Sequence, residues 1–316
     1  APSQPVHSGP VITEELIAAE EEYDTAVDRT HQYISNRADD LAIYLDSFFG
    51  NPISDIESAD SNMRATLRYD WDDDKGSDWG VKLRGKVDLP AFNRRLSLVF
   101  DGEEGGSESG YSEEEEDNNV GFQYNRYDRG KQRLDFTMGL TSGPNLKPGV
   151  RYRYQGPAGE NSRVRGIARL QYENEERFFS TFLGEYDHLI GTDSIVRWSN
   201  KVKYGERTQG AEWRSIVSYR HFYSEDSAWG IVAGVKGVTD AEDMFDELTG
   251  ESLTKAYGAG LRFRNRLFRD WFYVEVSPGY IWRQSYPMDD RHGVYQIRVD
   301  FQIAFNRGRE SPDKID

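Results

Sequence analysis

Lysine and arginine recur at every second position in several stretches of this sequence. In residues 78–90, Lys82, Arg84 and Lys86 alternate with Val81 and Leu83. Alternate side chains of an extended chain point to opposite faces, so one face of this segment is apolar and the other is basic. Like charges that line a space walled by low dielectric attract anions. The spacing therefore indicates a place where anions gather, provided that the basic side chains converge.

The same alternation assigns many more basic side chains to one face. The residues expected to line an anion-attracting lumen are Arg64, Arg68, Lys82, Arg84, Lys86, Arg133, Arg151, Arg153, Arg165, Arg197, Lys201, Arg262, Arg264 and Arg298, and parity adds Arg169, Lys203, Arg214 and Arg220. Carboxylates on that face are fewer, and they are Asp70, Asp88, Asp135, Glu173, Glu275 and Asp300. Two interpretations stay open: an interior that attracts anions, or arginine–carboxylate ladders that only stiffen a wall.

The chain offers little for catalysis. Its histidines are His7, His31, His188, His221 and His292, and only His221, near Ser224 and Asp226, loosely fits a hydrolase grouping. His221 shares parity with Trp213 and other apolar side chains, which favours an interfacial position instead. The acidic segment 240–251 lacks the alternating ligands and central glycine of an EF-hand loop. We therefore expect no enzyme, no metal site and no cofactor.

The elements that position these residues are strands with a period of two. We expect fourteen, near residues 62–72, 78–89, 94–101, 119–127, 132–142, 147–155, 163–173, 177–188, 194–205, 211–223, 228–239, 254–265, 271–284 and 292–305. The short third strand and the corner at 142–149 could merge with their neighbours, which leaves twelve as an alternative. Two connections are long, 101–119 and 240–252. On the fourteen-strand count both lie on the same side.

The N-terminal 61 residues differ from the strands in their composition and in the spacing of their apolar residues. Residues 1–11 are rich in proline and serine and should be irregular, and 12–49 carry apolar residues at helical spacing with acidic residues on the other faces. A linker follows at 50–61, the strands occupy 62–305, and a tail covers 306–316. The acidic helix could fold into the lumen as a plug, self-associate, or lie on the membrane surface. The opening residues would fit a mature exported protein whose signal peptide has been removed.

Composition excludes several classes. The 316 residues carry a formal net charge of −16, which disfavours a nucleic-acid partner because phosphates would be repelled. The mean hydropathy is −0.78, and no apolar run approaches the length that a spanning helix needs. There is no cysteine, so neither a disulfide nor a thiolate metal site can form.

Strand length and aromatic placement indicate a membrane barrel. Several strands exceed about ten residues, the length that a tilted strand needs to cross a bilayer, whereas strands of soluble sheets usually have about 5–6. A large soluble barrel or stacked sheet remains the alternative. Aromatic residues gather near strand ends, as in the girdles of membrane proteins, and they include Trp71, Trp79, Tyr124, Tyr127, Tyr219, Tyr223, Trp229, Trp271, Tyr273 and Trp282.

The closing strand, 292–305, resembles the last-strand signal of Gram-negative outer-membrane barrels, although eleven residues follow Phe305. The run at 269–282 is similar to uncharacterised proteobacterial outer-membrane proteins with an N-terminal helix. The resemblance implies an all-β, antiparallel, up-and-down transmembrane barrel with an N-terminal helical segment, in the outer membrane of a Gram-negative bacterium. Its partners would be outer-membrane lipid and lipopolysaccharide, with a homo-oligomer or a periplasmic protein engaged through residues 12–49.

A barrel of this kind could have either of two functions. The first is a porin-like channel with a basic lumen for anionic solutes, gated or plugged by the N-terminal helix. The second is a non-conducting anchor or structural protein whose helix docks a periplasmic or neighbouring partner.

Overall fold

The computed structural model describes residues 48, 62–89, 95–100, 120–128, 130–140, 146–174, 176–243, 245, 247–269 and 271–306, without the side chains of Asn62, Asp88, Leu140 and Asn306. The predicted helix at 12–49, apart from Phe48, lies outside the described residues, as do the linker, the connection at 101–119 and the tail. Within the described residues, no helix is long and apolar enough to span a membrane.

Fourteen strands form the described structure. They are β1 (Asn62–Asp72), β2 (Gly76–Asp88), β3 (Leu96–Phe100), β4 (Val120–Asp128), β5 (Gln132–Leu140), β6 (Leu146–Pro157), β7 (Ser162–Glu173), β8 (Arg177–Ile190), β9 (Ser194–Gly205), β10 (Ala211–Ser224), β11 (Ser227–Val238), β12 (Leu253–Arg266), β13 (Phe272–Arg283) and β14 (His292–Asn306). Each predicted strand end lies within two residues of the observed one. The count of fourteen is confirmed, and the alternative of twelve is wrong because β3 and β6 are separate strands.

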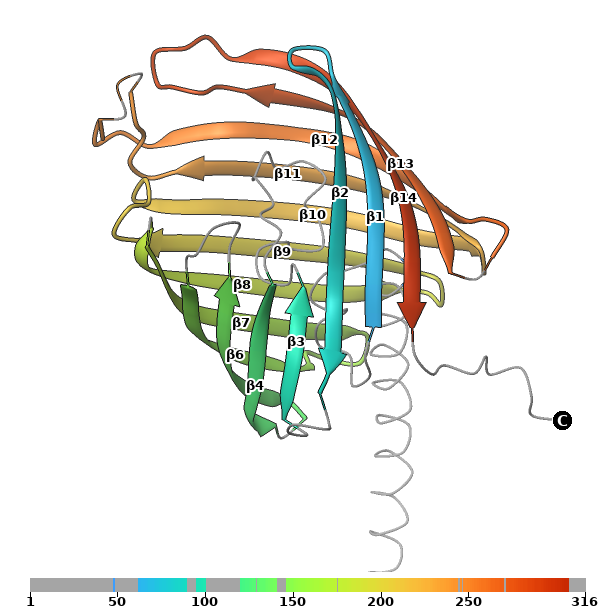
Figure 1. The fold of residues 1–316 in the computed structure, drawn as a ribbon. Coiled ribbons are helices and arrows are strands. Elements are labelled where there is room, and N and C mark those ends of the chain that lie inside the picture. Colours follow the sequence, from blue (N-terminus) through green and yellow to red (C-terminus); the bar gives the residue numbers. More distant parts are fainter. Residues whose placement is uncertain are drawn as a thin grey trace, which may run out of the picture.

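The strands close into one barrel (Figure 1). Each strand pairs antiparallel with its sequence neighbours, and β1 pairs with β14 from Asn62↔Asn306 to Asp72↔Gln296. This closure leaves no edge strand, so every strand has a hydrogen-bonding neighbour on both sides. The architecture is the predicted antiparallel up-and-down barrel.

The two ends of the barrel differ in their connections. At the end where β1 starts and β14 finishes, most even-numbered strands reach the next odd one through short turns, such as 158–161, 191–193 and 225–226. Gly191 adopts a φ of 71° in the second of these, a left-handed conformation that glycine tolerates. The long connections after β3 and β11 leave from the opposite end. We name the two ends the short-turn end and the long-loop end.

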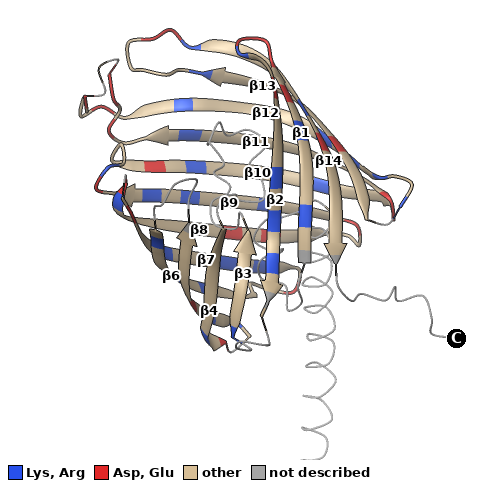
Figure 2. Ribbon diagram, viewed as in Figure 1, with Lys and Arg blue, Asp and Glu red and all other residues tan. Residues whose placement is uncertain are grey.

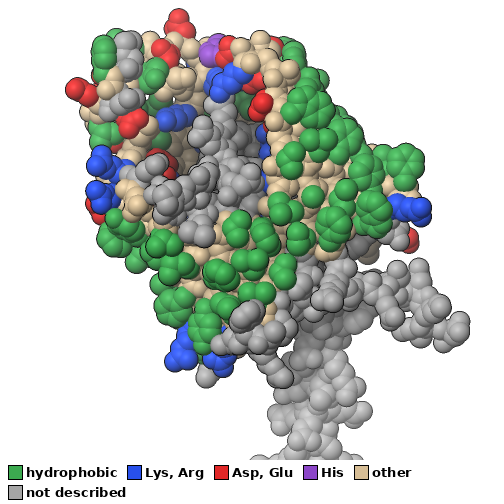
Figure 3. All heavy atoms as spheres, viewed as in Figure 1, with side chains coloured by type: hydrophobic (Ala, Val, Ile, Leu, Met, Phe, Trp, Pro, Cys, Tyr) green, Lys and Arg blue, Asp and Glu red, His purple; other side chains and the backbone are tan. Residues whose placement is uncertain are grey.

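The outer surface of the barrel is apolar. Val81 is 71% exposed, Trp79 60% and Leu170 56%, and each shares its face with the apolar side chains of the neighbouring strands. Figure 3 shows hydrophobic side chains crowded over the visible outer wall. Soluble monomers rarely expose an apolar area of this extent, whereas a membrane barrel needs it to meet lipid. The barrel is therefore built to span a membrane, and the soluble alternative does not fit.

One predicted girdle residue lies elsewhere. Tyr273 points into the barrel, where it packs against the buried cluster of Leu189, Ile195, Phe222 and Ala228. It shares parity with Glu275, whose carboxylate bonds to interior arginines. The prediction that Tyr273 belongs to the outer girdle is wrong because the position of Glu275 fixes the inward face of β13.

Val81 and Lys82, neighbours in the middle of β2, test the lipid-facing surface. Val81→Arg should prevent barrel assembly, because an arginine on the lipid face near the midplane costs about 2–4 kcal/mol. Lys82→Gln, which changes the inner face, should assemble normally. Heat-dependent migration in detergent gels would measure the folded fraction, and equal folding of both variants in lipid vesicles would contradict the assignment.

Candidate functional site: the basic interior

The strand registers place all fourteen predicted lumen residues on the inner face. Arg64 lies opposite Arg84, and Arg133 opposite Arg153, while Val81 and Leu67 pair on the outer face. Figure 2 shows basic positions recurring along strands around the barrel. The predicted inward carboxylates follow the same parity, although the side chain of Asp88 lies outside the described part.

Basic side chains outnumber acidic ones among the buried groups. Fourteen lysines and arginines in the described part of the chain are less than 9% exposed, against five carboxylates. The five carboxylates are Asp135, Glu185, Asp187, Glu275 and Asp300. The whole chain has a formal net charge of −16, so this set of buried groups has the opposite excess.

Sequence reasoning missed part of this set. Lys147, Arg163 and Arg283 are buried on the inner face, and so are Glu185 and Asp187. Arg163 shares parity with Arg165, so the same signal extends to it. The two acids could not be placed in this way, because β8 carries apolar side chains on both faces.

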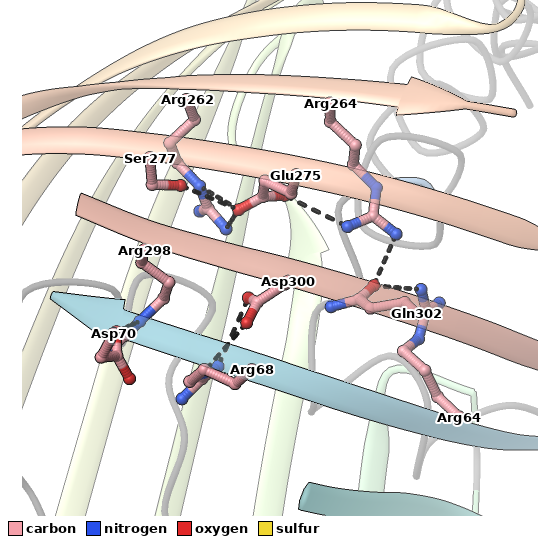
Figure 4. Close-up of polar contacts among 10 residues, drawn as sticks. All are labelled: Arg64, Arg68, Asp70, Arg262, Arg264, Glu275, Ser277, Arg298, Asp300 and Gln302. Atoms are coloured by element: carbon pink, nitrogen blue, oxygen red, sulfur yellow. Dashed lines mark hydrogen bonds and ion pairs between the residues drawn. The ribbon is translucent and has the colours of Figure 1, made fainter. Parts of the chain in front are cut away.

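The carboxylates join the basic residues into two ladders. The first crosses the seam of the barrel (Figure 4). Glu275 on β13 accepts from Arg262 Nε at 2.9 Å and from Arg264 Nη1 at 3.1 Å. Gln302 on β14 then accepts from Arg264 Nη2 at 2.6 Å and from Arg64 at 3.2 Å.

Two more ion pairs complete the first ladder between β14 and β1. Arg68 Nε donates to Asp300 at 2.9 Å, and Arg298 Nε donates to Asp70 at 2.5 Å. They lie across the β1–β14 pairing, which is the contact that closes the barrel. The first ladder therefore fastens the first strand of the barrel to the last.

The second ladder runs over β5 to β9. Asp187 accepts from Arg163 at 2.8 Å and from Arg197 at 2.6 Å. Asp135 accepts from Arg133 at 2.9 Å, and Arg165 Nε donates to Glu185 at 2.7 Å. Each carboxylate bonds to buried guanidinium groups, and removing one partner of such a pair leaves an uncompensated charge.

Several inward-pointing side chains are buried. Arg264 is 0% exposed, and Arg197 and Arg220 are each 1% exposed although they point inward. Val232 on the same wall is also 1% exposed.

Phe48 is also buried inside the barrel, at the short-turn end. Its ring is 4% exposed and contacts Phe222 edge-on, with centroids 4.8 Å apart. Tyr273 lies 5.6 Å away in the same geometry. The guanidinium of Arg264 lies over both rings, 5.6 Å from Phe48 and 4.7 Å from Tyr273. A residue fourteen positions before β1 is thus seated against the inner wall.

The long-loop end holds a cavity of about 450 Å³. Its walls mix charges of both signs, with Lys236, Lys255, Arg283 and Arg298 facing Asp70, Asp72, Asp78 and Glu242. Arg283 is bonded to Asp72 and Arg298 to Asp70. This cavity is the mouth of the barrel on the side of the long connections.

The predicted loose hydrolase grouping does not form. His221 Nδ1 bonds to Ser194 Oγ at 2.8 Å rather than to Ser224, whose hydroxyl accepts from the backbone of Asp226. His292 contacts Asp74 at 3.2 Å on the exposed rim. His7 and His31 lie outside the described residues. Within the described part, no group of three or more His, Asp or Glu residues is placed to hold a metal ion.

A closed antiparallel barrel with an apolar exterior and a charged interior is a transmembrane β-barrel of the outer-membrane type. No protein-family model matches the sequence, and no curated protein matches it. Among solved structures, OprD of Pseudomonas aeruginosa has a TM-score of 0.47 at 6% identity, covering 81% of this chain and 98% of its own. The COG4313 outer-membrane channel of Pseudomonas putida F1 has a TM-score of 0.43 at 10% identity, covering 79% and 98%. The KdgM porin has a TM-score of 0.37 at 8% identity, covering 77% and 99%. These are likenesses of fold alone.

The first ladder makes a prediction about stability. Glu275→Gln should lower the free energy of unfolding by about 3–5 kcal/mol, because two buried guanidinium groups lose their shared carboxylate. Glu247→Gln, at an exposed position of the β11–β12 connection, should change it little. Urea unfolding in detergent micelles, followed by tryptophan fluorescence, would measure both. Similar values for the two variants would show that the ladder adds no stability.

Proposed function

We propose that this protein is an outer-membrane channel of a Gram-negative bacterium whose basic lumen favours anionic solutes. The observation that supports this proposal is the excess of buried basic side chains over buried carboxylates on the inner wall. Field lines from like charges are focused inside a wall of low dielectric, so anions gather there. The mixed-charge mouth at the long-loop end, with Lys255 and Arg298 in its wall, offers these solutes an entrance.

The burial of inward-pointing side chains such as Arg197 and Arg264 fits a channel that rests closed. Phe48 supports closure at the short-turn end, because its buried ring packs against Phe222 and Tyr273 on the inner wall. Burial of a phenylalanine side chain stabilises such a contact by roughly 3–5 kcal/mol relative to alanine. We propose that the contacts of Phe48 with the inner wall hold the channel closed, so that Phe48 acts as a latch. Release of the ring would then widen the passage at the short-turn end.

The non-conducting anchor remains the second candidate. The observation in its favour is the same burial, since arginines such as Arg220, 1% exposed, line no open space. In that case the ladders stiffen the wall. Residues 12–49 would engage a second copy of the chain or a periplasmic protein.

Ion selectivity tests the basic lumen. In planar bilayers with a potassium chloride gradient, the reversal potential should indicate a preference for chloride. The preference should weaken as salt rises, because fixed charges are screened within about 10 Å at 0.1 M. Replacing Arg84, Arg197 and Arg262 together with glutamine should reduce it.

The matched control replaces three exposed turn residues, Lys131, Arg207 and Arg269, with glutamine and removes the same charge. It should leave the reversal potential close to wild type. Equal shifts in the two triple variants would mean that the overall charge, not the lumen, sets the selectivity.

Single-channel recording tests the latch. Phe48→Ala should shift the equilibrium between the closed and the open channel about a hundredfold or more toward the open state, since every 1.4 kcal/mol is a factor of ten. Phe268→Ala, at a turn position that is 91% exposed, is the control and should behave as wild type. If neither wild type nor Phe48→Ala conducts while both are folded barrels, the channel proposal gives way to the anchor.

A further inference from the structure

Three strands of the barrel begin with a serine at the short-turn end. They are β7, β9 and β11, and their first residues are Ser162, Ser194 and Ser227. Each serine bonds to a side chain near the end of the strand that follows. The pairs are Ser162 Oγ with His188 Nδ1 at 2.9 Å, Ser194 Oγ with His221 Nδ1 at 2.8 Å, and Ser227 Oγ with Asn265 Oδ1 at 2.7 Å.

A tyrosine hydroxyl joins each pair. Tyr186 bonds to Ser162 at 2.9 Å, Tyr219 donates to Ser194 at 3.1 Å, and Tyr223 donates to Asn265 at 3.2 Å. Three successive hairpins thus carry the same kind of polar cluster. We call these nine residues the polar rim.

The polar rim lies on the outer surface. Ser162 pairs in register with His188, Ser194 with His221, and Ser227 with Asn265, all at the outward parity of the apolar wall. Neighbouring strands are about 4.8 Å apart, so clusters on alternate strands follow one another at about 10 Å. A hydroxyl or imidazole in hydrocarbon is costly. The last residues of the strands therefore lie at the depth of the lipid headgroups.

The hydrogen bonds within each cluster engage one polar atom of the histidine or asparagine side chain and leave a nitrogen at its other end. Ser194 Oγ accepts from Tyr219 and is bonded to His221 Nδ1, so Nε2 is the ring nitrogen of His221 that the serine leaves for a lipid. Ser162 Oγ is likewise bonded to the Tyr186 hydroxyl and to His188 Nδ1, which leaves Nε2 of His188. In the third cluster two hydroxyls donate to Asn265 Oδ1, which leaves its NH₂ group as donor. Phosphodiester oxygens accept such donors.

Carboxylates lie on the water side of the first two clusters. Glu160 and Asp193 are exposed in the short turns that lead into Ser162 and Ser194. Asp226, which precedes Ser227, is instead bonded to Arg266 Nε at 2.6 Å. Donors at headgroup depth, with carboxylates beyond them, match a headgroup whose phosphate is nearest the acyl chains and whose ammonium extends toward water.

We propose that the polar rim binds phosphatidylethanolamine in the membrane leaflet at the short-turn end. The N–H donors of His188, His221 and Asn265 hold the phosphates. Glu160 and Asp193 attract the ammonium groups of the first two lipids and repel a purely anionic headgroup. The site is separate from the lumen and does not depend on whether the barrel conducts.

Native mass spectrometry of the detergent-solubilised protein tests this site, with phosphatidylethanolamine and phosphatidylglycerol added separately at equal concentrations. Wild type should retain more phosphatidylethanolamine. The variant His188→Ala/His221→Ala/Asn265→Ala should retain it roughly tenfold more weakly, as expected when hydrogen bonds to a charged group are lost. The control Leu170→Ala/Phe178→Ala/Tyr204→Ala, which removes exposed side chains from the same barrel wall at the long-loop end, should retain it as wild type does.

A second variant, Glu160→Gln/Asp193→Asn, changes only exposed turn residues and should leave the stability of the barrel unchanged. It should keep binding lipid but lose the preference for phosphatidylethanolamine. Equal retention of the two lipids by wild type would overturn the proposal. Unchanged retention in the folded histidine–asparagine variant would overturn it too, and so would an unchanged preference in the turn variant.

Discussion

Closure of the barrel between β1 and β14 is the constraint on which the rest of the structure depends. A membrane offers the backbone no water, so each N–H and C=O in the span must find a partner within the protein. The pairing from Asn62↔Asn306 to Asp72↔Gln296 supplies the last partners. Once the sheet closes, the pleat leaves only two places for a side chain, lipid or interior. Every charge in the spanning strands is thereby directed inward.

Because the charged side chains point inward, basic groups of like charge lie close together inside the barrel. Many arginines meet few carboxylates, and two of the buried carboxylates are each shared between two guanidinium groups. Glu275 serves Arg262 and Arg264, and Asp187 serves Arg163 and Arg197. Sharing satisfies hydrogen bonds without cancelling the charge, so the interior stays basic. The arrangement that stiffens the wall is also the one that would attract an anion.

The two ends of the barrel have different chemistry. The long-loop end opens into a mouth of mixed charge, whereas the short-turn end holds the apolar cluster around Phe48 on its inner side and the polar rim on its outer side. Along the rest of the wall, apolar side chains point outward and charged ones inward. At the short-turn end this is reversed, with apolar side chains inside and polar ones outside. Both departures occur where strands end, because there the surroundings change from hydrocarbon to headgroup and from lumen to water.

Alternation in the sequence determined the strand count and the face of most basic residues, because a period of two is a local property of the chain. It failed where both faces of a strand carry apolar residues: Glu185 and Asp187 on β8 were not placed, and Tyr273 was assigned to the wrong side. Only the tertiary structure decided which strands meet, and hence which carboxylate each arginine shares and which serine each histidine bonds. It also seated Phe48 inside the barrel. Such contacts join residues far apart in the chain, and their distances follow from barrel closure and register rather than from any local pattern.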